Sequence, residues 1–178
     1  MATYLAFLRA INLGPTRVFP KGDIQRVVEG AGFDGVATHI NTGNVRLETR
    51  MRSRARIEET LERAFFADRG FEVPTIVYPA GEFAAIADDT RRLGEEHPGL
   101  ARHYVYLMKD ELPAEQIAAV EARGDERGRM RVLGRAAHAL LQPGYEDGKV
   151  DPLSAARLLG VATNRNANVV QSLAAKWC

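Results

Sequence analysis

The hydrophobic and polar positions of the first 80 residues predict alternating strands and helices. An almost unbroken apolar run from Tyr4 to Ala10 stops at a Gly-Pro pair, which is typical of a buried strand followed by a turn. Two segments further along place apolar residues at helical spacing behind a capping side chain, and valines alternate in a strand from Glu72 to Tyr78. The helical positions are Ile24, Val27, Val28 and Ala31 after Asp23, and Ile57, Leu61, Ala64 and Phe65 after Ser53.

The segment between these two helices predicts a β-hairpin. Two short runs of β-prone residues, from Val36 to Ile40 and from Val45 to Leu47, flank a tip of Asn, Thr and Gly, which tolerates positive φ. We expect Ile40 to pair with Val45, so that the apolar residues of both strands face one side. The polar residues of the segment would then lie on the other side or at the tip; they are His39, Asn41, Asn44 and Arg46.

The second half of the chain repeats part of this order without detectable sequence identity. Phe83 and Ile86 predict a short helix, and the charged stretch from Asp88 to Ala101 predicts a polar connection. The remaining elements expected here are a strand at 104–108, a helix from Pro113, a hairpin of 130–133 with 136–141, a Pro/Gly loop at 142–149, a short helix from Asp151-Pro152, and a last helix capped by Thr163-Asn164.

The first half thus reads β-α-β-β-α-β, the split βαβ or ferredoxin-like order, and β-α-β-β recurs in the second. We therefore predict an α+β protein of two ferredoxin-like halves packed together, with C-terminal helices. The expected boundaries are residues 1–80 for the first half, 81–150 for a degenerate second half, and 151–178 for C-terminal helices that complete it.

Composition narrows the class of protein. At 178 residues with 46% hydrophobic and 26% charged residues, the chain suits one soluble globular domain or two closely joined halves. The net charge of +1 argues against bulk nucleic-acid binding, which needs a basic excess. We expect neither a membrane span nor a signal peptide, and Cys178, the single cysteine, cannot form an internal disulfide. A cytoplasmic protein, monomer or homodimer, is the expectation.

Three segments together resemble a known bacterial family. They run from Tyr4 to Gly14, from Thr42 to Val45, and from Ala162 to Asn166, and in this order they look like the uncharacterised family of domain of unknown function 1697. The resemblance spans nearly the whole chain. It implies a compact α+β fold of two ferredoxin-like halves, and it implies no established activity, substrate or cofactor.

The chain departs from the family pattern at five positions. The family usually has Gly at Ala10 and Pro15, Ser at Thr42, an aromatic residue at Ala167 and Thr at Val169. If these positions shape a pocket, its width and polarity differ in this member.

Candidate site residues lie where predicted elements end. Arg9 and Asn12 follow the first strand, where an Arg needs an anionic partner or solvent; the alternative is an Arg paired with a helix and an Asn that closes its own turn. The hairpin tip offers Asn41, Gly43 and Asn44, whose residue types also fit simple turn chemistry.

Arg165 and Asn166 are expected at the start of the last helix. The positive end of a helix dipole attracts anions there, and Arg adds a bidentate fork for carboxylate or phosphate. The alternative is that Asn164 caps the helix and Arg165 fastens the tail.

Other catalytic signals are weak. The four histidines, His39, His97, His103 and His138, lack metal-ligand spacing, and the chain holds no nucleophile elbow, Walker loop or dinucleotide fingerprint, so we expect no metal site and no cofactor. His39 is of interest because the expected register places it beside Arg46.

Three functions stay open, and the sequence does not decide whether the protein is an enzyme. The first is binding of a small anionic or phosphate-bearing molecule in a cleft of Arg9, Asn12, the 41–44 tip and Arg165. The second is binding of single-stranded nucleic acid, with Tyr104 and Tyr106 on one sheet face as stacking residues. The third is a structural or partner-binding role, for example dimerisation through a sheet edge.

Overall fold

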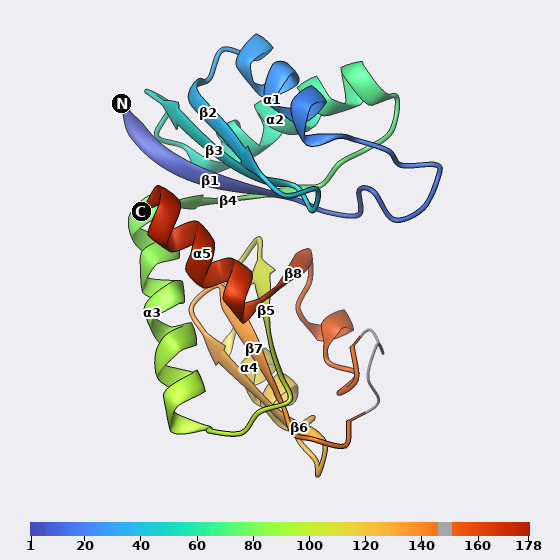
Figure 1. Cartoon of the computed structure of the whole chain (residues 1–178), viewed down its shortest axis with the longest axis vertical. Helices are drawn as coiled ribbons and strands as arrows, with labels where there is room; N and C mark the ends of the chain where they lie inside the picture. The colour runs from blue at the N-terminus through green and yellow to red at the C-terminus, as the bar shows by residue number, and fades with distance from the viewer. Residues whose placement is uncertain (146–150) are drawn as a thin grey trace. The chain divides into compact units, whose positions relative to one another are not determined.

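The computed structural model describes residues 1–145 and 151–178 and divides the chain into two units (Figure 1). The first unit holds Met1–Phe83 together with Trp177–Cys178, and the second holds Ala84–Lys176. Each unit contains a four-stranded sheet in which neighbouring strands are antiparallel. The α+β class predicted from the sequence is confirmed.

The first unit follows the predicted β-α-β-β-α-β order. Its elements are β1 (Ala2–Leu8), α1 (Lys21–Gly30), β2 (Asp34–His39), β3 (Asn44–Thr49), α2 (Arg54–Arg69) and β4 (Thr75–Pro79). The strands lie in the order β2-β3-β1-β4, so the split βαβ arrangement is confirmed. Strand β1 begins and ends two residues earlier than predicted; it cannot continue to Ala10, because that residue leaves the extended region with a φ of 58°.

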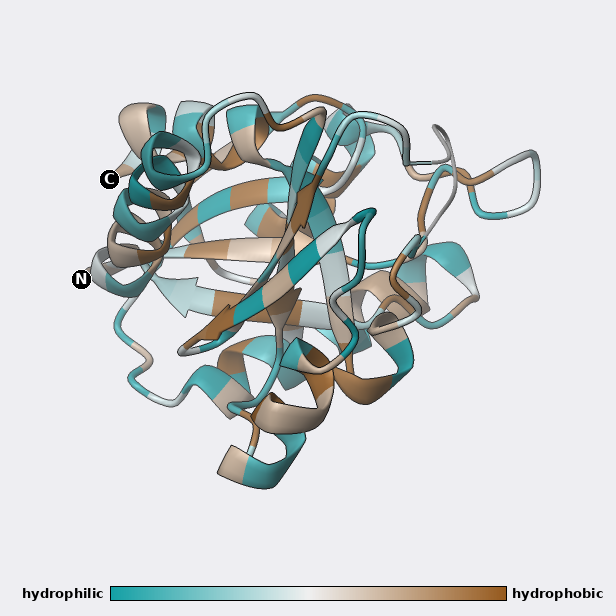
Figure 2. Cartoon of the chain, turned by 90° about the horizontal axis from the view of Figure 1, so that it is seen from below, coloured by the Kyte–Doolittle hydropathy of each residue, from teal (hydrophilic) through white to brown (hydrophobic). Residues whose placement is uncertain are grey.

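The two helices cover one face of this sheet (Figure 1). Tyr4, Ala6 and Leu8 of β1 pack with the apolar residues of α1 and α2, as alternation along a strand requires. Figure 2 shows that the helices carry both hydrophobic and hydrophilic residues, as expected for helices with one buried and one solvated face. The opposite face buries Phe7, whose ring lies 5.9 Å from Tyr78 and 5.2 Å from Phe83 between centroids. Both faces of β1 are therefore apolar, which explains its unbroken apolar run.

Of the two helix caps predicted in the first unit, the structure confirms one. Ser53 caps α2 by accepting the backbone N–H of Arg56 at 3.3 Å. The expected cap of α1 is wrong, because the helix begins at Lys21 after Pro20 and Asp23 lies in its first turn. An Asp in the first turn still interacts favourably with the helix dipole, which explains the misleading signal.

The predicted hairpin exists, but its register is wrong by two residues. Thr38 pairs with Val45 and His39 with Asn44, so the tip contains the four residues from Ile40 to Gly43. Ile40 has a φ of 51° and Gly43 a φ of 81°, which removes Ile40 from the strand. A shift of two residues preserves the faces of both strands, so the predicted apolar side is still the buried one.

The second unit repeats the strand arrangement of the first. Its elements are β5 (Arg102–Met108), α4 (Ala114–Glu121), β6 (Gly128–Leu133), β7 (Ala136–Leu141), a 3₁₀ turn η1 (Ala156–Leu158) and β8 (Ala162–Asn166), with α5 (Ala167–Trp177) after them. The order β6-β7-β5-β8 corresponds strand by strand to the first sheet. Two similar halves are therefore confirmed, and η1 stands where the first half has its second helix.

Helix α3 (Ala80–Glu96) corrects the predicted polar connection. The helix continues to Glu96, because Ile86, Thr90 and Leu93 recur at helical spacing and are buried. The charged residues of the stretch lie on its outer face, where Arg92 pairs with Asp89 and Glu96 at 3.0 Å. The charged residues of this stretch therefore belong to the solvent-exposed face of a helix and not to a polar connection.

The C-terminal segment also differs from the prediction. Both carboxylate oxygens of Asp151 accept backbone N–H groups of Ala155 and Ala156, but only the short η1 follows. Residues 162–166, expected at a helix start, form strand β8. Part of the predicted 142–149 loop, residues 146–149, lies outside the described residues.

Glutamates cover backbone donors at an edge of each sheet. The Thr75 and Val77 N–H groups of edge strand β4 are accepted by Glu62 at 2.9 Å and Glu58 at 3.1 Å, both from α2. In the second unit, Glu121 of α4 accepts the N–H of Val132 on edge strand β6 at 3.2 Å. Edge donors that are already bonded do not recruit another strand, which discourages edge-to-edge pairing at these positions.

Candidate functional site

Strand β1 ends against the tip of the first-unit hairpin. The backbone N–H of Leu8 donates to the carbonyl of Gly43 at 2.9 Å. A Cβ on Gly43 would lie 2.7 Å from the Leu8 Cβ, so this close approach requires glycine. Of the expected site residues, the structure brings Arg9, Asn12 and the 41–44 tip into this one neighbourhood of the first unit.

Asn12 acts as a structural clip between the loop and the tip. Its Nδ2 donates to the carbonyls of Phe19 at 3.0 Å and Asn41 at 2.8 Å. Its Oδ1 accepts the N–H of Phe19 at 2.7 Å, and its backbone has a φ of 54°. These bonds use both ends of the amide, which agrees with the reading of Asn12 as an Asn that closes its own turn.

The tip residues divide into buried and exposed members. Asn44 is buried and donates to the His39 carbonyl at 2.9 Å and to the Thr42 hydroxyl at 2.8 Å, which is turn chemistry. Asn41 is exposed, and its carbonyl holds Asn12 while its side chain has no hydrogen bond within residues 1–145 and 151–178. Only Asn41 therefore presents a side-chain amide outward.

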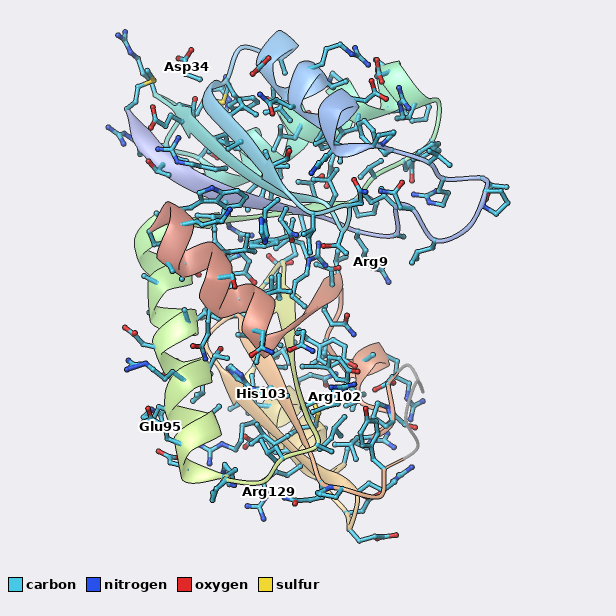
Figure 3. All side chains as sticks on the ribbon, in the orientation of Figure 1. Arg9, Asp34, Glu95, Arg102, His103 and Arg129 are labelled. Atoms are coloured by element: carbon cyan, nitrogen blue, oxygen red, sulfur yellow. The ribbon has the colours of Figure 1, made fainter. Side chains whose placement is uncertain are left out.

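Arg9 and Arg17 have different roles at this edge. Arg9 is exposed (Figure 3), and its guanidinium forms no hydrogen bond or ion pair with the described part of the chain. Arg17, which the sequence did not single out, donates to the carbonyls of Ala10 and Glu72, both at 2.5 Å, and stacks on Phe71 at 4.6 Å. Arg17 fastens the loop, and Arg9 remains available to a ligand.

His39 does not form the expected pair with Arg46. Arg46 lies opposite Ala37 and binds Glu48 at 2.5 Å and the Gly35 carbonyl at 2.6 Å. The guanidinium of Arg46 is thus bound by residues of the hairpin itself.

Arg165 and Asn166 lie on strand β8, and the expectation that Arg165 starts the last helix is wrong. Arg165 pairs with Val105 and is 6% exposed. Its guanidinium donates to the Thr163 hydroxyl and to the Asn164 carbonyl, both at 2.8 Å, and burial lowers its pKa to about 10. A buried guanidinium held by its own strand supports β8 and is not an exposed anion fork.

Asn166 immediately precedes α5 and caps it. Its Oδ1 accepts the backbone N–H of Asn168 at 3.1 Å, the bond of a helix N-cap, so the cap is Asn166 and not Asn164. This bond orients the amide and leaves the Nδ2–H donors for other partners.

A cavity of about 360 Å³ lies beside Asn166 in the second unit. It is open to solvent on one side and is lined by the end of α3 and the following loop, the start of β5 and the start of α5. Its polar side chains include His97, Arg102, His103, Asn166, Asn168 and Gln171. None of the described lining residues is acidic, so no carboxylate among them would repel an anion.

His103 joins this cavity to a buried second histidine. Its Nε2 lies 3.0 Å from the Nδ1 of His138, which is fully buried on β7. Burial lowers the pKa of His103 to about 4, helped by the nearby His97. Burial also lowers the pKa of His138 to about 3, with further contributions from His103, Arg92 and Arg131. Both rings are therefore neutral near pH 7.

The sequence did not reveal this pair, because the two residues are 35 positions apart. Pairing the two predicted strands would have brought the histidines together, because each histidine interrupts an otherwise apolar strand. The structure shows no group of three or more His, Cys, Asp or Glu side chains within its described ranges that could hold a metal ion. None of the helices in those ranges is long and apolar enough to span a membrane.

Comparison with known proteins supports the fold. The family model described as "Protein of unknown function (DUF1697)" matches residues 1–138. Among solved structures, the conserved bacterial protein SP0830 from Streptococcus pneumoniae is similar to 99% of this chain and 98% of its own, with a TM-score of 0.66 and 21% identity. No curated protein matches. At this identity the likeness concerns the fold.

Proposed function

The chain belongs to the DUF1697 family, and we propose that it binds a small molecule with a carboxylate or phosphate oxyanion in the cavity of its second unit. The observation that carries this proposal is a lining that, among the described residues, holds an arginine and several amide side chains and no acidic residue. Its volume of about 360 Å³ suits a small metabolite. A buried carboxylate or phosphate needs such donors to replace its hydration.

Each part of the lining supplies a different donor. Arg102 contributes a positive charge to the lining, and Asn166 contributes its Nδ2 group. The cavity also includes Ala167 and Asn168 at the start of α5, where the helix dipole favours negative charge. Charge-assisted bonds of this kind are stronger than bonds between neutral groups.

Isothermal titration of the full chain with inorganic phosphate and with nucleoside monophosphates tests this function. We expect saturable binding that weakens roughly tenfold or more in Arg102→Gln, because one charge-assisted hydrogen bond contributes about 1.5–3 kcal/mol. Arg91→Gln is the matched control, since Arg91 is an exposed arginine outside the cavity whose partner is Asp88 on its own helix. Absence of binding, or equal affinities in both variants, would contradict the proposal.

We propose that Arg9 and Asn41 form a second, separate site in the first unit for the same class of ligand, a small molecule with a carboxylate or phosphate group. Support comes from their exposed, uncommitted side chains and from the rigid support that Asn12, Gly43 and Asn44 give them. Arg9→Gln should lower phosphate affinity in the same titration while Arg50→Gln, an exposed arginine just past β3, should not. Equal affinity of these two variants would remove the first-unit part of the proposal.

The nucleic-acid alternative has lost its main support. Tyr106 is buried and Tyr104 is partly buried, and both pack in the second-unit core with Met108. Aromatic rings in a core cannot stack on bases. Binding of single-stranded RNA at low salt in a polarisation assay would restore this alternative, and light scattering would test the expected monomer or homodimer.

A further inference from the structure

The His103–His138 contact restricts where the ring protons lie. In a hydrogen bond between two neutral imidazoles one nitrogen donates and the other accepts, so only two arrangements exist. In the first, His103 Nε2–H donates and His138 carries its proton on Nε2. In the second, His138 Nδ1–H donates and His103 carries its proton on Nδ1. In the first arrangement His103 presents a bare Nδ1 acceptor to the cavity, and in the second it presents an Nδ1–H donor.

The surroundings of His138 distinguish the two arrangements. Its Nε2 is buried and has no hydrogen-bond partner among the described residues. The charged and titratable groups that act on this ring are Arg92 from α3, Arg131 from β6 and His103 from β5. The carboxylates of Asp89, Glu96 and Glu121 are bound to those two arginines. An N–H at this position would be a buried donor without an acceptor among the described residues, and orphaned buried N–H groups are rare, which favours a bare Nε2.

We propose that His138 holds His103 in the Nδ1–H form, so that His103 and Asn166 together donate to an unprotonated oxygen of a carboxylate or phosphate in the second-unit cavity. This inference rests on the proposed function and names the ligand group that the cavity recognises. His103 Nδ1 has no hydrogen bond in the structure's described ranges, and it is not among the buried unsatisfied atoms, so it is accessible.

A neutral donor has a specific chemical consequence. A protonated His103 would bind any anion by charge, whereas a neutral N–H requires an acceptor oxygen at one position. Because the pKa values of both rings are lowered, the donor stays in place throughout the neutral range. His138 is thus a positioning residue that acts through His103.

Nitrogen-15 NMR of the histidine rings in the full chain tests the proposal, since chemical shifts separate protonated from bare ring nitrogens. We expect protonated Nδ1 and bare Nε2 in His103, and a saturable shift of the His103 Nδ1–H signal on titration with inorganic phosphate. His138→Asn offers an amide in place of Nδ1–H and should keep the tautomer, whereas His138→Leu should release it. His103→Leu should weaken phosphate binding about fivefold, the equivalent of one neutral hydrogen bond.

The results separate this inference from the function on which it rests. If phosphate shifts the backbone amide signals of 166–168 but His103 carries its proton on Nε2, the inference is wrong and the proposed binding stands. If no cavity signal responds to phosphate or to acetate, both fail. A His138→Leu variant that keeps the Nδ1–H form would show that His138 does not position the ring.

Discussion

Asn12 donates a hydrogen bond from its side-chain amide to the backbone carbonyl of Asn41 at 2.8 Å, which ties the loop after β1 to the hairpin tip. The two residues are 29 positions apart; Asn12 lies in a segment that carries the family resemblance, and Asn41 directly precedes another. The same amide closes the loop onto Phe19. Residues that a reader of the sequence assigns to ligand binding can thus be the scaffold on which a site is built.

Loss of the Asn12 clip should destabilise the first unit. Asn12→Ala removes three side-chain hydrogen bonds and leaves a Cβ residue at a φ of 54°, so we expect a loss of about 2–3 kcal/mol in the free energy of unfolding. Urea unfolding of the full chain measures it. Leu13→Ala is the control, because Leu13 is 77% exposed. Equal stability of the two variants would show that the clip is dispensable.

A side chain at position 43 should not fit. Gly43→Ala combines a φ of 81° with a Cβ contact of 2.7 Å to Leu8, and we expect a cost of about 2–4 kcal/mol by chemical denaturation. Gly70→Ala has nearly the same φ, 78°, with no atom within 4 Å of the new Cβ, and should cost about 1 kcal/mol. The difference between the variants isolates the steric contact, and no difference would contradict its role.

The glutamates that cover edge strand β4 should matter for folding. Glu58→Leu leaves the Val77 N–H without this acceptor and breaks the 3.0 Å pair with Arg54, so we expect a loss of about 2–3 kcal/mol. Glu58→Gln keeps an acceptor oxygen and should lose about half as much. Glu59→Gln is the exposed control, since surface pairs such as Glu59 with Arg63 contribute little. Thermal unfolding followed by circular dichroism would rank the three variants, and any other order would argue against edge coverage.

Acid should destabilise the protein through His138. Its pKa is about 3 in the folded chain and 6.5 in the unfolded one, so between these values the unfolded state binds more protons. Stability therefore rises with pH in this window and falls as the solution is acidified below pH 6.5.

Replacement of His138 should remove this dependence. One group that is protonated only on unfolding contributes about 1.4 kcal/mol per pH unit, so His138→Leu should reduce the slope of stability against pH by about that amount. Urea midpoints between pH 6.5 and about 4, where the partner His103 begins to titrate, provide the measurement. Above pH 7 the free energies of unfolding of the wild type and His138→Leu should change with pH in parallel. An unchanged slope in acid would show that His138 does not cause the pH dependence.

Local patterns predicted most elements because they depend on neighbours in the sequence. The apolar spacing of α1 and α2, the Ser53 cap and the sides of the hairpin strands were read correctly. The hairpin register was not, since the φ of Ile40 depends on how the tip packs against β1. The length of α3 was missed because its charges were read without the buried stripe beneath them.

The sequence by itself determined the two ferredoxin-like halves, because periodicity and capping are properties of short segments. Only the tertiary structure decided that Arg165 is a buried strand residue, that Asn166 caps α5, and that His103 meets His138 beside a donor-lined cavity. The physical reason is that burial and strand pairing join residues that no local spacing connects, and burial changes what a histidine or an arginine can do.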